Sequence, residues 1–254
     1  MIPLCVAHRG ASVEAPENTL RAFARALELG ADGIELDVQV TRDGVAVVFH
    51  DSTLKRLTGA RGRLVDRTWS ELLKLCVQGE PIPTLTDVLA LTRKRAILQI
   101  EIKKGVPVAP VLAAIRRTAS TGNVILASFE PDILSHAAVL GPKLPRMLIA
   151  DQPKTPIRFL AKDPKEAKVE TSTIRHSPLA MHLVHAMASV GASGISVCHE
   201  AIKSPLFVET VHRHGAQLWT WTVNNAPDMR RLRDYEVNAI ITDNPAKLIE
   251  TLQA

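Results

Sequence analysis

The stretch Gly33-Ile34-Glu35-Leu36-Asp37-Val38-Gln39-Val40 is a short, largely apolar run that predicts a β-strand. Comparable runs recur along the rest of the chain, and amphipathic, helix-like stretches separate them. In chain order the eight runs are Pro3–His8, Gly33–Val40, Ala96–Lys103, Val124–Phe129, Arg146–Ala150, Gly194–Cys198, Gln217–Thr222 and Ala239–Asp243. Strands that alternate with helices in this number predict an α/β fold with a closed parallel sheet, the (β/α)8 TIM barrel.

An open, doubly wound sheet is the alternative fold for such a pattern. That fold usually carries a glycine-rich first turn, whereas the first turn here reads His8-Arg9-Gly10-Ala11. The length of 254 residues is typical of one barrel, and we expect a single domain over residues 1–254. Residues 151–177 are rich in Lys, Pro, Asp and Thr and follow the fifth strand. We interpret them either as a mobile loop or lid or as a plain surface insertion.

One additional strand is expected after the second barrel strand. The run Val45–His50 is reached through Thr41-Arg42-Asp43-Gly44, and Asp-Gly between two such runs is a strong hairpin signal. If Asp43 and Gly44 are the two turn residues, Arg42 pairs with Val45 and, counting back, Asp37 pairs with His50. The sequence therefore predicts an extra β-hairpin that brings His50 beside Asp37.

The overall charge is compatible with an anionic ligand. The net charge of +5 suits a phosphate ester but equally serves solubility, and the scattered basic residues do not favour nucleic acid as a partner. The three cysteines show no disulfide or zinc spacing, and reduced thiols indicate a cytoplasmic protein. No signal peptide is visible, and no apolar run approaches the roughly 20 residues that span a bilayer, so we expect no stable membrane insertion. The oligomeric state stays open.

Three carboxylates are expected to meet at the carboxyl ends of the strands, where the active sites of TIM barrels lie. Glu35 and Asp37 are two residues apart and so share one face of the second strand, and Glu101 lies on the third. Packed together without a cation, they would raise each other's pKa. A hard divalent cation resolves this conflict, and all-oxygen ligands favour Mg²⁺ or Ca²⁺. The alternative is that ion pairs with Arg9 and Lys103 neutralise them.

Two histidines are expected at the same rim of the barrel. His8 ends the first strand, and His50 ends the hairpin. Because histidine accepts and donates protons near neutral pH, the pair suggests a general acid and a general base for cleaving a phosphodiester. Arg9 and Lys103 carry fixed positive charges that suit phosphate oxygens. The other histidines are interpreted as surface or packing residues, with His199 as the one reserve candidate.

Several short motifs follow one another along the chain. The first four are Ala7-His8-Arg9-Gly10-Ala11, Pro16-Glu17-Asn18-Thr19, Gly33-Ile34-Glu35-Leu36-Asp37-Val38 and Val48-Phe49-His50-Asp51, and the later ones are Pro83-Thr84-Leu85, Gln99-Ile100-Glu101-Ile102-Lys103, Ser128-Phe129, Trp221-Thr222-Val223-Asn224 and Thr242-Asp243-Asn244-Pro245. In order and spacing the chain resembles the glycerophosphodiester phosphodiesterase family. Only about 30 residues separate Asp51 from Pro83, so it resembles the small form, which lacks the added domain of larger members.

The resemblance implies a set of site residues and a cofactor. The cofactor would be one divalent cation, Mg²⁺ or Ca²⁺, and the substrate a small glycerophosphodiester. The family pattern places metal ligands at Glu35, Asp37 and Glu101, the general acid and base at His8 and His50, and phosphate contacts at Arg9 and Lys103. We interpret Trp221, at the end of the seventh strand, either as a wall for the glycerol or head group or as a core tryptophan.

The resemblance also implies a reaction, within lipid and glycerol metabolism. The glycerol hydroxyl next to the ester attacks phosphorus, a cyclic phosphate forms, and water opens it to glycerol 3-phosphate after an alcohol has left. A lysophospholipase D that cleaves lysolipids is an alternative enzyme, which would need an apolar groove for an acyl chain. A non-catalytic barrel that binds phosphodiesters is a third possibility, and it predicts the loss of at least one of the five acid, base or metal residues.

Overall fold

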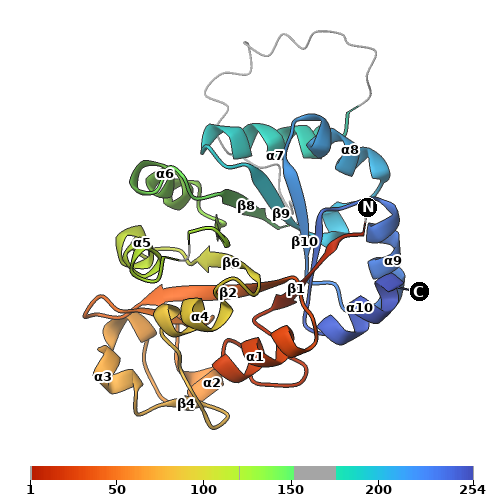
Figure 1. Cartoon of the computed structure of the whole chain (residues 1–254). Helices are drawn as coiled ribbons and strands as arrows, with labels where there is room; N and C mark the ends of the chain where they lie inside the picture. Colours follow the sequence, from red (N-terminus) through yellow and green to blue (C-terminus); the bar gives the residue numbers. More distant parts are fainter. Residues whose placement is uncertain (1, 120, 152–175, 254) are drawn as a thin grey trace.

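The computed structural model describes residues 2–119, 121–151 and 176–253. The expected loop, lid or insertion at 151–177 lies, apart from its ends, outside the described residues. In the described part, parallel strands form a closed barrel (Figure 1), because β1 (Leu4–His8) pairs with β2 (Gly33–Val40) on one side and with β11 on the other. The other barrel strands are β6 (Ile97–Ile102), β7 (Val124–Ser128), β8 (Arg146–Ala150), β9 (Gly194–Cys198), β10 (Gln217–Trp221) and β11 (Ala239–Thr242). The TIM-barrel prediction is confirmed, and the predicted strand ends are within one residue of those observed.

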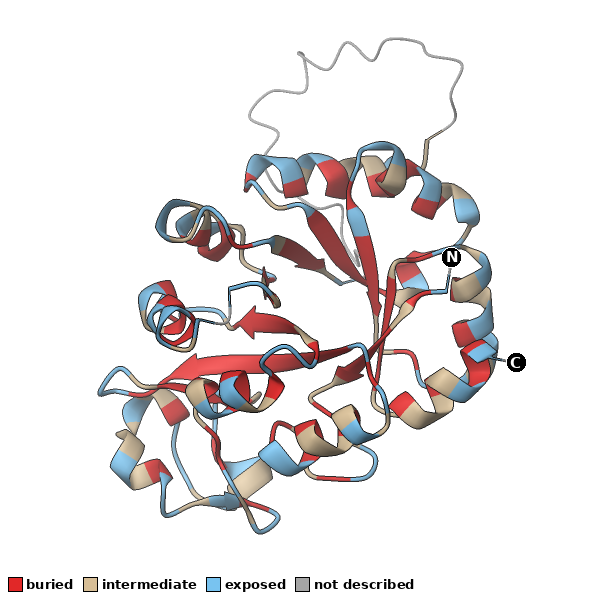
Figure 2. Ribbon diagram, viewed as in Figure 1, coloured by how far each residue is buried: buried red, intermediate tan, exposed pale blue. Residues whose placement is uncertain are grey.

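Helices form the outer layer around the strands. They are α1 (Leu20–Glu28), α4 (Leu85–Thr92), α5 (Val108–Arg117), α6 (Pro131–Leu140), α7 (Pro178–Ser189), α8 (Pro205–Arg213), α9 (Ala226–Asp234) and α10 (Pro245–Gln253). Several of them begin with a side-chain cap, as in α1, where the Thr19 hydroxyl accepts a hydrogen bond from the amide of Ala22 at 3.2 Å. Figure 2 shows that the barrel strands are largely buried and that the helices bury mainly their inner faces.

Two apolar layers make up the core of the barrel domain, one outside the ring of strands and one inside it. The larger one lies between the strands and the helices and includes Phe23, Leu36 and Ile100. The smaller one, inside the barrel, is made by alternate residues of the strands, Val6, Ala127, Met147, Ile149, Trp219, Ala239 and Ile241. This inner layer fills the interior of the barrel below the carboxyl ends of the strands. The polar side chains of the strands therefore gather at the carboxyl ends, above this layer.

The extra strand after β2 is present, but its predicted register is wrong by one residue. β3 (Ala46–Val48) pairs with β2 through Val38↔Val48, which places Phe49 rather than His50 opposite Asp37. The loop has three residues instead of two, because the Thr41 amide donates to the Val45 carbonyl at 2.9 Å.

Local bonds explain the longer loop. The Thr41 hydroxyl bonds to Asp43 at 2.6 Å and accepts from the Val45 amide at 2.9 Å, and Gly44 takes a positive φ of 84° that glycine adopts without strain. The observed register also places Phe49 in the small apolar cluster that the next segment builds. A slip by one residue would turn Phe49 to the other face.

The segment between β3 and α4 forms a small lobe beside the barrel mouth (Figure 1). It contains α2 (Lys55–Thr58), the 3-10 turn η1 (Leu64–Asp66), α3 (Trp69–Leu72), and a short hairpin of β4 (Cys76–Val77) and β5 (Glu80–Pro81). Its apolar cluster consists of Val47, Phe49, Leu54, Leu64, Leu72, Val77 and Ile82. This lobe therefore packs on the hairpin that leads to His50.

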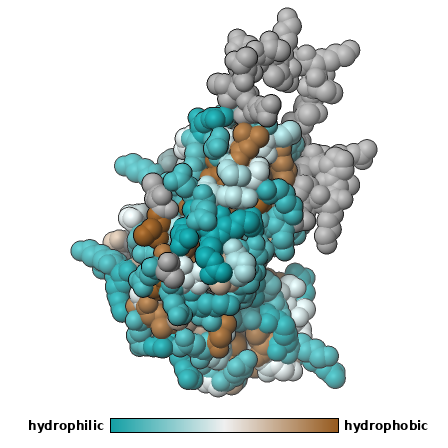
Figure 3. Space-filling view, turned by 90° about the vertical axis from the view of Figure 1, so that its right-hand side faces the viewer, coloured by the Kyte–Doolittle hydropathy of each residue, from teal (hydrophilic) through white to brown (hydrophobic). Residues whose placement is uncertain are grey.

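The surface over α9 and α10 is largely hydrophilic with separate apolar patches (Figure 3). No helix among the described residues is long and apolar enough to cross a membrane. Cys5 and Cys198 are buried, and Cys76 is exposed. A second 3-10 turn, η2 (His199–Ala201), follows β9.

Candidate active site

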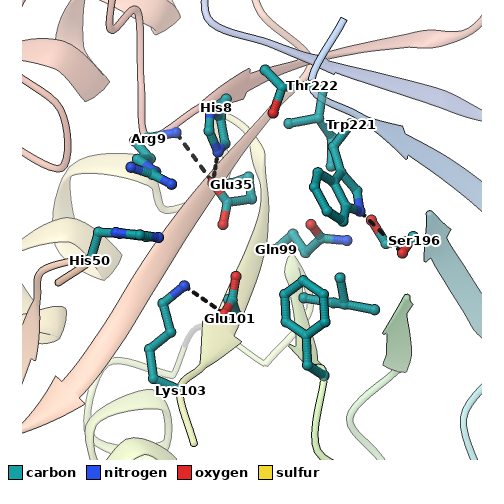
Figure 4. A pocket seen from close by; sticks show the side chains of 13 residues that line it. His8, Arg9, Glu35, His50, Gln99, Glu101, Lys103, Ser196, Trp221 and Thr222 are labelled. Atoms are coloured by element: carbon teal, nitrogen blue, oxygen red, sulfur yellow. Dashed lines mark hydrogen bonds and ion pairs between the residues drawn. The ribbon is translucent and has the colours of Figure 1, made fainter. Parts of the chain in front are cut away.

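A pocket of about 160 Å³ opens at the carboxyl ends of the barrel strands (Figure 4). Its wall is charged on one side and apolar on the other. Seven of the eight predicted site residues line it, namely His8, Arg9, Glu35, His50, Glu101, Lys103 and Trp221. The eighth, Asp37, lies directly behind this wall, where 1% of its surface is exposed. The fold thus brings together residues that are far apart in the sequence.

The three predicted metal ligands form one buried cluster. Asp37 of β2 is the register partner of Glu101 of β6, and Glu35 precedes them on the same face of β2. Each residue offers an oxygen within 4.8 Å of the other two, so the cluster could hold a metal ion. Burial and the charge of Asp37 raise the pKa of Glu35 to about 8, and the same two causes raise the pKa of Glu101.

Two cations share the cluster with the carboxylates. Lys103 Nζ lies 2.7 Å from Asp37 Oδ1 and 2.6 Å from Glu101 Oε1, and Arg9 Nε lies 3.2 Å from Asp37 Oδ2. Burial alone would raise the pKa of Asp37, but the charges of Lys103 and Arg9 outweigh it and hold the pKa at about 2. These contacts are the ion pairs expected as the alternative to a cation. They leave Glu35 as the carboxylate whose charge is least compensated.

The donor set of this cluster fits a hard divalent cation. It consists of carboxylate oxygens, which Mg²⁺ and Ca²⁺ prefer, and it is buried and convergent. The pKa of Glu35 stays raised, by burial and by the charge of Asp37, although Lys103 and Arg9 lie in the same cluster. A divalent cation would supply the missing positive charge.

His8 is held by an aspartate from the other end of the chain. Its Nδ1 lies 2.6 Å from Asp243 Oδ1, and its Nε2 lies 3.9 Å from Glu35 Oε2. Burial lowers the pKa of His8, but the hydrogen bond to Asp243 and the charge of Glu35 outweigh it and raise the pKa above its usual value. Because Asp243 accepts the Nδ1 proton, Nε2 is the nitrogen that faces the pocket.

His50, which also lines the charged side of the pocket, has the same arrangement. Its Nδ1 lies 2.7 Å from Asp51 Oδ1. Burial lowers the pKa of His50 below its usual value, and the nearby charge of Lys103 acts in the same direction. Each predicted acid–base histidine therefore has a carboxylate at Nδ1, but the electrostatic surroundings move the two pKa values apart.

The apolar wall of the pocket is aromatic. Trp221 and Phe129 meet edge to face with ring centroids 5.8 Å apart, and the indole N–H of Trp221 donates to the Ser196 carbonyl at 3.2 Å. Phe129 is 41% exposed at the mouth. Trp219 is 2% exposed and belongs to the barrel core, whereas Trp221 is partly buried, packs against the same inner layer and lines the pocket.

The comparisons with known proteins agree with this geometry. The model of the glycerophosphoryl diester phosphodiesterase family matches residues 8–247. A glycerophosphodiester phosphodiesterase of Caldanaerobacter subterraneus subsp. tengcongensis is 33% identical over 100% of this chain and 99% of its own length. The chain belongs to the glycerophosphoryl diester phosphodiesterase family.

Solved structures show the same fold for other proteins. The structure of a glycerophosphodiester phosphodiesterase from Agrobacterium tumefaciens matches this chain with a TM-score of 0.78 and 27% identity. The match covers 98% of this chain and 99% of the Agrobacterium tumefaciens chain. A phosphodiesterase from Oleispira antarctica, solved with the product sn-glycerol 3-phosphate, matches with a TM-score of 0.84 and 22% identity, over 100% of this chain and 98% of that chain. At 22% identity, this second match shows the fold of the chain.

Several residues of this chain that contact the site residues have no role predicted from the sequence. Asp243, Glu17 and Asn18 occur in the quoted motifs, but their partners were not evident from the sequence. Asn18 donates to Asp37 Oδ2 at 2.8 Å, and both side chains are buried. The reserve candidate His199 lies outside the pocket, with its Nδ1 3.9 Å from Asp228 Oδ2.

Proposed function

We propose that this chain hydrolyses glycerophosphodiesters to glycerol 3-phosphate and an alcohol by acid–base catalysis between His8 and His50. The observation that carries the proposal is the pocket that combines two imidazoles, each oriented by a carboxylate, with a buried cluster of three carboxylates. The Oleispira antarctica enzyme of the same fold was solved with sn-glycerol 3-phosphate, which supports a glycerol phosphate as the product here. The continuous family match over residues 8–247 supports one catalytic domain.

The reaction needs two proton transfers in each step. In the first, one imidazole takes the proton of the glycerol hydroxyl that attacks phosphorus, and the other gives a proton to the alkoxide whose bond to phosphorus breaks. A cyclic phosphate results. In the second step the imidazoles exchange roles: one takes a proton from water as it attacks phosphorus, and the other returns a proton to the glycerol oxygen that leaves. Each imidazole is then back in its starting state.

The charged residues bind and orient the phosphate in this scheme. Glu35, Asp37 and Glu101 would hold Mg²⁺ or Ca²⁺, which when bound neutralises phosphate charge and lowers the pKa of the substrate hydroxyl. Lys103 contacts Asp37 and Glu101 and would share them with that cation, and Arg9 borders the pocket beside them. We propose that both turn positive charge toward the phosphate oxygens.

The aromatic wall contacts the carbon skeleton of the substrate. Trp221 faces the charged residues across the pocket (Figure 4), and Phe129, which also lines the pocket, packs edge to face against it. A phosphate held at the charged side therefore places the glycerol or head group against the two rings. The ring faces exclude water from that part of the pocket.

A product analysis tests the proposal. Purified protein is incubated with glycerophosphocholine and followed by ³¹P NMR, first with a chelator and then with Mg²⁺ or Ca²⁺ restored. We expect glycerol 3-phosphate and choline only after a cation is added. Release of phosphocholine would show that the bond between phosphorus and the glycerol oxygen is cleaved, which contradicts the proposal. Full activity in the presence of the chelator would refute the requirement for a metal ion. Lysophosphatidylcholine, run in parallel, tests the lysophospholipase D alternative.

A further inference from the structure

We propose that Arg56 is a positioning residue that fixes His50 and Arg9 at the same time. The inference deepens the proposed function and rests on it, because it assigns a role within the same reaction. Arg56 lies in α2 of the small lobe and outside the pocket of about 160 Å³. Its guanidinium nevertheless contacts the carboxylates that hold these two pocket residues.

The first carboxylate is that of Asp51. Arg56 Nε donates to Asp51 Oδ2 at 2.6 Å, and Arg56 Nη2 donates to Asp51 Oδ1 at 2.7 Å. The same Oδ1 faces His50 Nδ1 at 2.7 Å. The bidentate contact therefore fixes the plane of the carboxylate that in turn fixes the imidazole of His50.

The second carboxylate is that of Glu17. Arg56 Nη1 donates to Glu17 Oε2 and Arg56 Nη2 to Glu17 Oε1, each at 2.9 Å. Glu17 Oε1 also accepts from Arg9 Nη1 at 2.9 Å. Arg9 needs such an anchor, because it is a non-glycine residue with a positive φ of 56° and its Nε contacts Asp37 as an ion pair without a hydrogen bond.

Only a planar fork can make both contacts. All three guanidinium nitrogens of Arg56 are used, and Nη2 serves both carboxylates. A lysine at this position carries one point charge and cannot bind two carboxylates bidentately. Since Arg56 is 49% exposed, its ion pairs contribute little to folding stability, and the effect of the network falls on the geometry of the site.

Kinetics of Arg56→Lys and Arg56→Gln test the proposal. We expect kcat/KM on glycerophosphocholine to fall about 10- to 100-fold in both variants, the range known for partners that orient site residues, with the thermal midpoint close to that of the wild type. Arg25→Gln is the matched control: Arg25 is 42% exposed and bridges Glu14 and Glu28, but it lies in neither wall of the pocket. We expect this control to retain wild-type kinetics.

A double-mutant cycle separates positioning from general damage. If Arg56 acts partly through Asp51, the losses from Arg56→Gln and Asp51→Asn should combine to much less than their product. Losses that multiply fully would overturn the link, as would wild-type kcat/KM in both Arg56 variants. An Arg56→Gln protein that fails to fold leaves Arg56→Lys to decide.

A spectroscopic readout keeps this proposal distinct from the proposed function. Long-range ¹H–¹⁵N NMR at alkaline pH reports which nitrogen of a neutral imidazole carries the proton, and a His50→Asn sample assigns the signal. We expect His50 to carry its proton on Nδ1 in the wild type and in Arg25→Gln, and to show a mixed tautomer in both Arg56 variants. An unchanged His50 signal in both Arg56 variants would overturn the positioning role, whatever the activity of the enzyme. A wild type that is inactive on every glycerophosphodiester would refute the proposed function, and the NMR signal would still test the positioning role.

Discussion

Replacing Asp243 by asparagine should remove most of the activity while keeping the shape of the site. The Asn224 amide is fixed, because its Oδ1 accepts from the Thr242 hydroxyl and from the Asp243 amide, both at 3.0 Å. Its Nδ2 must therefore donate to position 243, as it does to Asp243 Oδ2 at 2.6 Å. The carboxylate accepts on both sides, since its Oδ1 faces His8 Nδ1 at 2.6 Å.

An amide at position 243 cannot satisfy both neighbours. With its oxygen toward Asn224, its NH₂ group faces His8 and forces the imidazole proton onto Nε2, so that the pocket nitrogen is in the wrong state. With its NH₂ group toward Asn224, two donors meet. We expect Asp243→Asn to lower kcat by about 10²–10⁴-fold, the range that one acid–base residue contributes, or roughly 2.7–5.4 kcal/mol of barrier.

Steady-state kinetics on glycerophosphocholine measure this loss. The control is Asp228→Asn, which changes an aspartate near another rim histidine, His199, outside the pocket. Its kcat should stay near the wild-type value. An Asp243→Asn enzyme that keeps wild-type kcat would show that the contact with His8 does not set the state of the pocket nitrogen, and the acid–base role of His8 would lose its main structural support.

Three further predictions concern the same pocket. Because the pKa of Glu35 is raised from 4.5 to about 8, its ionisation opposes folding, and the thermal midpoint of the metal-free wild type should fall as pH rises from about 5 to 8. Addition of Mg²⁺ or Ca²⁺ should restore the midpoint, whereas Glu35→Gln should show neither the fall nor the restoration. Since the pKa of His8 is raised and that of His50 is lowered, His8→Ala but not His50→Ala should be largely rescued on a p-nitrophenyl ester, which needs no acid; equal loss in both would contradict this division. Trp221→Phe should change KM for several head groups, and an unchanged KM would exclude the wall role.

The barrel and its carboxylate cluster were predictable because both follow from local periodicity. Side chains two residues apart share one face of a strand, so Glu35 and Asp37 had to point the same way. Neighbouring parallel strands then bring Asp37 opposite Glu101, as the register shows. The position of His8 at the end of β1 follows from the same rule, since active sites of this fold lie at the strand ends.

The hairpin register was not predictable from the Asp-Gly signal alone. That dipeptide suits a two-residue turn, but the hydroxyl of Thr41 bonds to Asp43 and to the Val45 amide and closes a three-residue loop. His50 still lines the pocket, because it lies two residues beyond Val48, the last residue of β3, and is oriented by Asp51 rather than by strand pairing. The error in register therefore did not displace the predicted residue from the site.

Pairings across long sequence separations were also out of reach. His8 and Asp243 are 235 residues apart, and Arg56 and Glu17 are 39 apart. Each is an ordinary polar residue in its own segment, and only the closing of β1 against β11, or the packing of the small lobe, creates the contact. A motif can mark such a residue, but its partner depends on tertiary structure.

The charge balance of the cluster connects the predicted ligands with the cations found beside them. Arg9 and Lys103 both approach Asp37, which consequently stays ionised, while Glu35 is left with a pKa of about 8. In the cluster without a metal, burial and the charge of Asp37 therefore oppose the ionisation of Glu35 and of Glu101. A bound divalent cation would favour the ionised form of Glu35 and compete with Lys103 for Asp37 and Glu101. The ion pairs and the proposed metal site, set out as alternatives from the sequence, would thus be two charge states of one cluster, and a cation that displaced Lys103 would free that lysine for the proposed contact with the phosphate.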